Sequence, residues 1–307
     1  MKPKMAIKYW QDAVNYKQAQ QMAIQALGDI GYMHRYKSEN NQVYGFRDAE
    51  SNRWIIKIAG KEDYQRLGLL KEIKCLRKLK DLGLPVAEIF CTHETLKDGC
   101  QPFFIIPYLG KSLKYWEQNN KMITRIMHET GRFIRSLSET KENFFNEDIL
   151  MDRNITLEYF HAECRDNMAY LKDNGLFDTS VEKCLEWATY VYHNTKPSVG
   201  QNQASEPLVD DGGNIWFVDF EGGLNFTYPL KSLECIAHYI ENRNEYNIAK
   251  NELLQGFYGN GSEITDEVNK EWARWRQYKA LTDLVFLSVT RNDSNIFYEN
   301  WNKYCIK

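Results

Sequence analysis

Two acidic residues, Asp219 and Glu221, follow a short apolar segment of this chain and precede a pair of glycines. The segment contains Ile215, Phe217 and Val218, a composition that is typical of a strand. Hard divalent cations prefer carboxylate oxygens that a rigid element holds in place. The pattern is compatible with a metal site, but a solvated strand end is the more common explanation of such spacing, because exposed acids are common.

A second charged pair, Lys57 and Glu72, lies in the N-terminal part of the chain. Lys57 interrupts the apolar run 55–59, and an isolated lysine in a strand usually extends its ammonium group into solvent. Glu72 lies beside the apolar stripe of a helix that the spacing predicts over 67–83. Since a buried charge needs a partner, the sequence allows an ion pair between these side chains without requiring it.

The composition indicates a globular protein without a strong electrostatic preference. The chain has 307 residues, 43% of them hydrophobic, which suits one large domain or two lobes. With 39 basic and 42 acidic side chains the net charge is -3, so nucleic acid and membrane surfaces are not expected partners. The seven scattered cysteines show no pair spacing typical of zinc. The start lacks a secretory pattern, and we expect a cytoplasmic protein.

Residues 1–108 are predicted to form a small domain that mixes a sheet with helices. In chain order the pattern predicts a helix over 15–30, a polar loop over 38–41, a hairpin of strands near 43–46 and 54–58, the helix over 67–83, and strands over 86–92 and 101–107. Pro107 ends the strand pairing and Gly110 frees the chain. The domain boundary is therefore expected near 108–111, with a second domain over 109–307.

The second domain is predicted to be mostly helical, which makes the whole chain α+β. Helices are expected over 122–138, 157–174, 181–194, 229–240, 247–258 and 266–288. The aromatic stripe of the last helix is typical of a core. A hairpin interrupts the helices, with strands over 207–209 and 214–220 around a turn at 210–213 whose adjacent glycines permit positive φ angles.

The order of these parts resembles a protein-kinase-like fold, and in detail the sequence resembles the aminoglycoside phosphotransferase and choline kinase family. Segment 38–44 is similar to the family's nucleotide-covering loop, Lys57 to its phosphate-binding lysine, and Glu72 to the helix partner of that lysine. Further similar segments are 82–86, 109–113 and 253–259. The resemblance runs from about Tyr32 to near the C-terminus and implies two lobes, a small antiparallel-sheet N-lobe and a mostly helical C-lobe.

The resemblance also implies the cofactors and the residues that bind them. ATP and Mg²⁺ are the implied cofactors, and a small molecule is the implied acceptor substrate. The implied nucleotide-binding residues are Ser38, Asn40, Lys57, Glu72, Ile106 and Tyr108. Asp219 is the implied catalytic and metal-binding acid, opposite the catalytic loop.

The catalytic loop departs from the family pattern. Members of the family carry His-Gly-Asp, four residues and then Asn, whereas this chain has Val199-Gly200-Gln201, four residues and then Glu206. Gln201 can orient a hydroxyl group but cannot accept its proton, and loss of a general base costs about 100- to 10,000-fold in rate. Glu206 offers a carboxylate oxygen, so with Asp219 it could bind Mg²⁺, although a surface glutamate before Pro207 is an equally ordinary interpretation.

Three functions stay open from these residues. The preferred hypothesis is an ATP-dependent phosphotransferase that acts on a hydroxyl group of a small molecule, with Gln201 orienting the acceptor and Glu221 or Asp210 as a substitute base. The alternative is a catalytically degenerate kinase-like protein, a pseudokinase, that binds nucleotide or a protein partner. Nucleotidyl transfer or ATP hydrolysis is the third. Acids on the helix near 152–166 would suit a cationic acceptor or simply form a solvated face.

Overall fold

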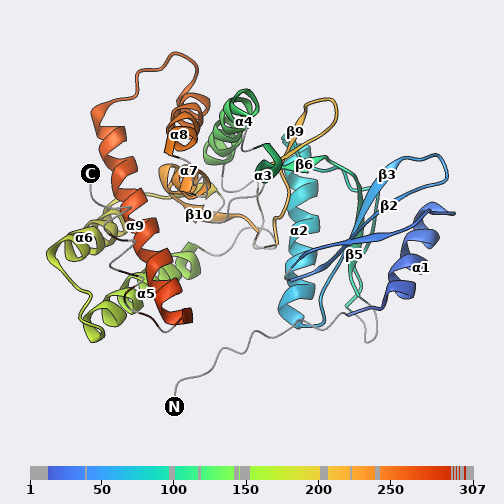
Figure 1. The fold of residues 1–307 in the computed structure, drawn as a ribbon, viewed down its shortest axis with the longest axis horizontal. Helices are drawn as coiled ribbons and strands as arrows, with labels where there is room; N and C mark the ends of the chain where they lie inside the picture. The colour runs from blue at the N-terminus through green and yellow to red at the C-terminus, as the bar shows by residue number, and fades with distance from the viewer. Residues whose placement is uncertain are drawn as a thin grey trace. The chain divides into compact units, whose positions relative to one another are not determined.

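The computed structural model describes residues 13–38, 40–96, 101–116, 119–141, 145, 153–200, 207–221, 223–238, 243–291, 293, 295, 297 and 301. It divides the chain into two compact units. Unit 1 comprises residues 1–116 and 205–223, and unit 2 comprises residues 117–204 and 224–307. The hairpin that carries Asp219 therefore belongs to the N-terminal unit, although in the sequence it lies between the helices of unit 2 (Figure 1).

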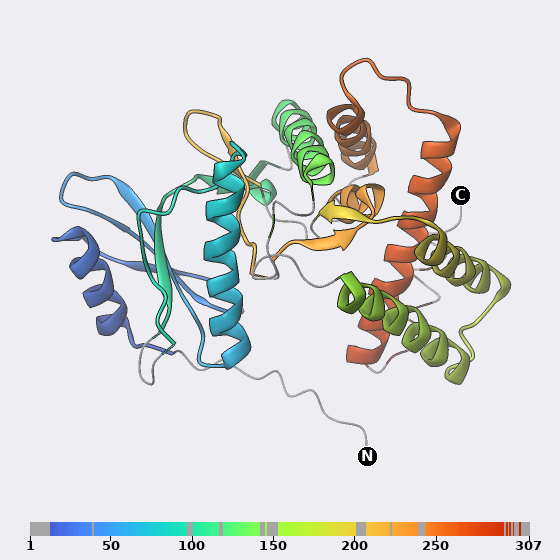
Figure 2. The ribbon, with the colours of Figure 1, turned by 180° about the vertical axis from the view of Figure 1, so that it is seen from behind.

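Unit 1 is built on an antiparallel sheet with the strand order β1-β2-β3-β5-β4. The strands are β1 (His34–Tyr36), β2 (Gln42–Arg47), β3 (Arg53–Ile58), β4 (Cys91–His93) and β5 (Phe103–Pro107). Two helices, α1 (Tyr16–Leu27) and α2 (Asp63–Asp81), lie on opposite sides of this sheet in both ribbon views (Figures 1 and 2). The predicted hairpin and the two predicted helices are present, whereas β1 was not predicted.

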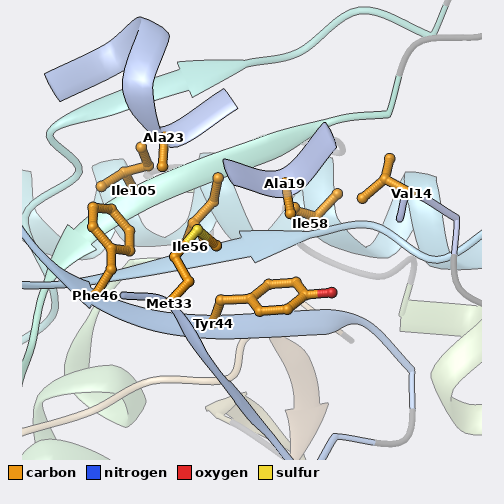
Figure 3. Packing of buried hydrophobic residues seen from close by; sticks show 9 residues of the cluster. All are labelled: Val14, Ala19, Ala23, Met33, Tyr44, Phe46, Ile56, Ile58 and Ile105. Carbon is orange, nitrogen blue, oxygen red and sulfur yellow. The ribbon is translucent and has the colours of Figure 1, made fainter. Parts of the chain in front are cut away.

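One face of the sheet packs against α1. Figure 3 shows Ala19 and Ala23 of the helix directed toward the apolar side chains of β2, β3 and β5. Ile56 and Ile58 of β3 are fully buried in this cluster. Because side chains alternate between the two faces of a strand, Lys57 must lie on the opposite face, toward α2.

Two hairpin loops of unit 1 share one hydrogen-bond motif. In each, an aspartate accepts a backbone N–H from an asparagine four positions later at 2.8 Å. Its second oxygen accepts from that asparagine's amide and from a tryptophan indole two positions further on. Desolvation opposes these bonds, but they outweigh it and lower the pKa of both aspartates. The motif consists of Asp48, Asn52 and Trp54 between β2 and β3, and of Asp210, Asn214 and Trp216 in the later hairpin.

The later hairpin joins β8 (Leu208–Val209) to β9 (Ile215–Trp216) and pairs with β6 (Lys111–Ser112), which α3 (Leu113–Trp116) follows. The predicted strand over 214–220 is too long. It ends at Trp216 because the N–H of Phe217 donates to the carbonyl of Pro85 at 2.8 Å and because Asp219 adopts φ 71°, outside the strand region.

The predicted strand over 86–92 is also too long. Val86 forms only an isolated parallel bridge with Phe217, and the regular strand begins at Cys91. The first part of this segment therefore supports the hairpin of Asp219, and only its last residues pair with β5.

Unit 2 is mostly helical. Its described helices are α4 (Asn120–Glu139), α5 (Arg153–Asp173), α6 (Thr179–Asn194), α7 (Pro229–His238), α8 (Arg243–Tyr258) and α9 (Asp266–Arg291), and β7 (Ser198–Gly200) pairs with β10 (Asn225–Thr227). Each helix predicted for this part corresponds to one of them. Trp272, Trp275 and Tyr278 of α9 are at most 2% exposed, which confirms that the aromatic stripe is core. No described helix is long and apolar enough to span a bilayer.

Candidate active site in unit 1

Lys57 is the centre of a cluster of charged side chains in unit 1. Its Nζ lies 2.7 Å from Oε2 of Glu72, 3.2 Å from Oδ1 of Asp219 and 2.6 Å from Oε1 of Glu221. The Lys57 side chain is only 12% exposed and that of Glu72 only 2%. The amine is therefore enclosed by three carboxylates and largely shielded from water.

The pKa shifts of Lys57 and Glu72 follow from this enclosure. Burial alone would lower the pKa of Lys57, but the carboxylates of Glu72, Asp219 and Glu221 outweigh it and raise the pKa well above its usual value. Burial raises the pKa of Glu72, and Lys57 opposes this shift. The ammonium group is therefore charged at neutral pH, and in this structure carboxylates occupy it.

Helix α2 positions Glu72 against two other parts of unit 1. The helix buries Leu69, Ile73 and Leu76 at helical spacing, and Glu72 lies on the same buried side. One oxygen of its carboxylate binds Lys57, and Oε1 accepts from the backbone N–H of Phe220 at 3.3 Å. Glu72 thereby links strand β3 to segment 219–221.

Segment 219–221 delivers two carboxylates to the same amine. Phe220 is fully buried, so the acids on either side of it are held near Lys57. Asp219 has φ 71°, a left-handed conformation that is uncommon outside glycine, although aspartate tolerates it better than most residues. Such backbone strain is concentrated at functional sites. Here it directs the Asp219 carboxylate to Lys57.

Asn41 ties Glu221 to the loop before β2. Its amide group donates to Oε1 of Glu221, and its Oδ1 accepts from the backbone N–H of Gly60 at 3.3 Å. Gly60 permits this approach, because a Cβ there would lie 2.6 Å from the carbonyl oxygen of Asn40. Sequence reasoning placed Asn41 in the polar loop but did not name it as a site residue. The only signal was its position at the end of that loop.

The three carboxylates could also hold a cation. Oxygen atoms of Glu72, Asp219 and Glu221 all lie within 4.8 Å of one another. An all-oxygen donor set of this kind suits Mg²⁺ or Ca²⁺. Of the predicted metal ligands, Asp219 belongs to this group, whereas Glu206 lies outside the described residues, as does the predicted catalytic residue Gln201.

Glu221 was noted with Asp219 in a pattern compatible with a metal site, but it was named only as a substitute base and not as a predicted ligand. The available signal was the Asp-x-Glu spacing around an apolar residue. Only the structure shows that Phe220 is buried and that the carboxylates on either side of it lie close together.

At the end of β5, the backbone groups of the residues predicted to contact the nucleotide are partly engaged in pairing with β3. Ile106 pairs with Ile55 of β3, and the backbone N–H of Tyr108 donates to the carbonyl of Arg53 at 2.9 Å. The guanidinium group of Arg53 lies 3.5 Å from the centre of the Tyr108 ring. Ser38 and Asn40 in the loop before β2 are exposed.

Pro107 and Leu109, at and just after the end of β5, have a carbonyl and an N–H group, respectively, that are not hydrogen bonded to β3. Backbone groups alternate in direction along an antiparallel strand, so the carbonyl of Pro107 faces away from β3. Strand β4 pairs only with residues 103–105 and does not cover it. Among the described residues, no backbone acceptor is found for the N–H of Leu109. The carbonyl of Pro107 and the N–H of Leu109 are therefore candidate nucleotide-binding groups that the sequence did not reveal.

The acids suggested for a cationic acceptor are not equivalent. Glu163 is exposed and accepts a hydrogen bond from the hydroxyl of the buried Tyr278 at 2.6 Å. Glu158 and Asp166 are exposed, and Asp152 lies outside the described residues. The alternative of a solvated face describes Glu158 and Asp166.

The family model of the phosphotransferase enzyme family matches residues 36–190. A search of curated protein sequences finds no match. Among solved structures the chain is similar to the amicoumacin kinase hAmiN in complex with AMP-PNP, Ca²⁺ and Ami, with 12% identity over 95% of this chain and 93% of that one and a TM-score of 0.65. It is also similar to ADP-bound aminoglycoside phosphotransferase APH(2'')-Ib, with 12% identity, coverage of 95% and 97%, and a TM-score of 0.60.

A third similar structure is the macrolide 2'-phosphotransferase MphH from Brachybacterium faecium, with 11% identity, coverage of 95% and 98%, and a TM-score of 0.59. These likenesses confirm the fold expected from the sequence, with an antiparallel sheet in the N-terminal part and a mostly helical remainder.

Proposed function

Because the chain belongs to the phosphotransferase enzyme family, we propose that it transfers the γ-phosphoryl group of ATP to a hydroxyl group of a small molecule. The observation that carries the proposal is the enclosure of Lys57 by the carboxylates of Glu72, Asp219 and Glu221. Two of the similar structures hold AMP-PNP or ADP, which supports an adenine nucleotide as the donor. The antibiotics named for the similar enzymes support a small-molecule acceptor. Use of ATP as the donor supports a cytoplasmic location.

In this proposal Lys57 binds the α- and β-phosphates, and Glu72 holds the ammonium group in place. The base of the nucleotide binds at the end of β5, where it accepts from the N–H of Leu109 and donates to the carbonyl of Pro107. Ile106 and Tyr108 then contribute side-chain contacts, since their backbone groups are hydrogen bonded to β3. Ser38 and Asn40 cover the phosphates from the loop before β2.

Asp219 and Glu221 are the proposed Mg²⁺ ligands, with Glu206 as a further one. Their oxygens fit the ion because they are hard donors that converge near the phosphate-binding amine. When bound, Mg²⁺ neutralises charge on the transferred phosphoryl group. Gln201 orients the acceptor hydroxyl. Since phosphoryl transfer depends mainly on positioning and charge, the missing base slows the reaction without abolishing it.

The second candidate function is a pseudokinase that binds nucleotide or a protein partner without turnover. Two observations favour it: Gln201 replaces the family's base, and Glu221 already occupies the amine of Lys57.

Ligand-induced stabilisation and phosphoryl transfer test the proposal together. Mg²⁺-ATP should raise the melting temperature of the wild-type protein by mass action, and Asp219→Asn should abolish the Mg²⁺-dependent part. Asp81→Asn is the control, because that side chain is exposed at the end of α2 in the same unit. Labelled phosphate should then move from ATP to an acceptor in a panel of amicoumacin, aminoglycosides and macrolides. Gln201→Asp should raise the rate on the order of 100- to 10,000-fold by restoring the base.

The outcomes separate the candidates. Binding without transfer in both the wild type and Gln201→Asp would favour the pseudokinase. Absence of any nucleotide-induced stabilisation would contradict the phosphotransferase and would leave only a kinase-like protein that binds a protein partner.

A further inference from the structure

A cavity in unit 2 lies apart from the residues of the proposed nucleotide site. Its volume is about 460 Å³, within the range typical of small-molecule sites. The lining residues that matter here are Ser180, Lys183 and Trp187 of α6, Arg274 and Gln277 of α9, and Trp301. The three α6 residues share one helix face because they are spaced by three and four positions, and the two α9 residues are spaced by three.

The aromatic walls of the cavity are held in place by other rings. Trp187 packs edge-on against Trp275, with ring centres 4.7 Å apart and planes inclined by 71°. Trp301 stacks on Phe297 at 5.6 Å and is 3% exposed. A ring that enters the cavity would therefore meet aromatic surfaces that are already ordered, so little side-chain entropy is lost on binding.

The two charged residues of the described lining, Lys183 and Arg274, are both cationic. Lys183 and Arg274 are exposed, and among the described residues neither has a carboxylate within ion-pair distance. The guanidinium group of Arg274 lies 5.6 Å from the centre of the Trp187 ring. No aspartate or glutamate belongs to the described lining. The lining residue Cys184 adds no negative charge, because burial raises its pKa to about 12.

The neutral polar groups of the lining add donors. Ser180 offers a hydroxyl group and Gln277 an amide. Asp178 caps α6 by accepting from the backbone N–H groups of Ser180 and Val181 at 2.9 Å. Glu182 and Glu186 of the same helix lie outside the described lining. The cavity thus combines aromatic walls with two cations and further donors.

We propose that this cavity binds a small planar anion, an aromatic carboxylate or phosphate whose ring packs against Trp187 and whose charged group contacts Lys183 and Arg274. A planar guanidinium group pairs well with either oxyanion, and an ammonium group adds a second positive charge. The anion also screens the two cations from each other. The site needs none of the residues of the proposed phosphotransferase reaction and stands independently of that function.

The test uses the full chain and three probes: phenylacetate, phenyl phosphate and the neutral analogue phenylacetamide. The readout is the indole N–H resonance of Trp187, assigned from its loss in Trp187→Phe. The expected result is a saturable shift with at least one anion and no saturation with phenylacetamide. The tighter of the two anions identifies the carboxylate or the phosphate as the preferred group.

A second binding experiment uses variants that remove the charges of the cavity. The double variant Lys183→Gln with Arg274→Gln should weaken anion binding on the order of tenfold or more, whereas Lys270→Gln, an exposed lysine of α9 outside the lining, should leave it unchanged. Added salt should weaken binding to the wild type, which tests the role of charge even if the double variant unfolds. Equal binding of the neutral analogue, salt-independent binding, or wild-type affinity in the folded double variant would overturn the proposal.

Discussion

The amine of Lys57 lies 2.6 Å from Glu221, as close as it lies to its helix partner Glu72 at 2.7 Å. Asn41 donates to the same Glu221 oxygen and so holds the carboxylate against the amine. An incoming phosphate must therefore replace a carboxylate at Lys57. A cation that binds Glu221 would assist this exchange, because it offers the carboxylate another partner.

Glu221→Gln should reduce the metal dependence of nucleotide binding. Without the charge of Glu221, free ATP should bind more tightly, whereas Mg²⁺-ATP should lose a metal ligand. We expect the ratio of the two affinities to fall on the order of tenfold, which isothermal titration calorimetry with and without Mg²⁺ measures. Asp81→Asn, at an exposed position at the end of α2, should keep the wild-type ratio. An unchanged ratio in Glu221→Gln would contradict the arrangement.

Lys57→Met should destabilise the fold as well as weaken nucleotide binding. The substitution preserves much of the side-chain volume but leaves the buried Glu72 carboxylate without its cation. Breaking a buried ion pair from one side costs about 3 to 5 kcal/mol. Urea unfolding checks the free energy, and Lys17→Met, at an exposed position of α1, is the control. Wild-type stability in Lys57→Met would show that the enclosure contributes little.

His238 should make stability depend on pH in unit 2. Burial alone would lower its pKa, but Asp283 of α9 and Glu234 of α7 raise it from 6.5 to about 9. A raised pKa stabilises the fold fully below 6.5, and this contribution is lost as the pH rises through about 9. The shift corresponds to about 3 kcal/mol at most.

Urea unfolding of the wild type at about pH 6 and about pH 10 measures this loss. His238→Gln should be less stable at the lower pH and should show a smaller difference between the two conditions. The same pH difference in both proteins would assign it to other groups.

Two glycine substitutions in unit 1 should differ in cost. Gly110 has φ 104°, and a Cβ there would lie 1.8 Å from the carbonyl oxygen of Val209. Gly83 has φ 71°, but a Cβ there would meet no atom within 4 Å. Gly83→Ala should cost about 1 to 2 kcal/mol from backbone strain. Gly110→Ala should cost at least about 3 kcal/mol, because overlap adds to the strain. Chemical denaturation compares the two, and equal costs would contradict the close approach.

The paired hairpin motif should contribute to stability at mildly acidic pH. Asp48 and Asp210 have lowered pKa values in the fold, so their contribution is present above the usual value of 3.8 and is lost as the pH falls through the lowered values. Replacing both with Asn should lower the urea midpoint at neutral pH and flatten its dependence on acid. Circular dichroism measures both, and an unchanged acid profile would show that other carboxylates dominate.

The sequence alone determined the elements that carry the site. Apolar periodicity predicted the helix of Glu72 and the hairpin of Lys57, since both patterns depend on neighbours within one turn or one strand pair. The helices of unit 2 were predicted for the same reason. Local turn chemistry also predicted the later hairpin, where two glycines follow the aspartates.

Only the tertiary structure decided which side chains meet. Lys57 could have faced solvent, and its contact with Glu72 exists because β3 buries Ile56 and Ile58 on the opposite face. Asn41 and Glu221 are 180 positions apart in the chain, and no local pattern relates them. The physical reason is that secondary structure follows from interactions between near neighbours, whereas this site depends on packing between distant segments and on the strained backbone of Asp219, which that packing maintains.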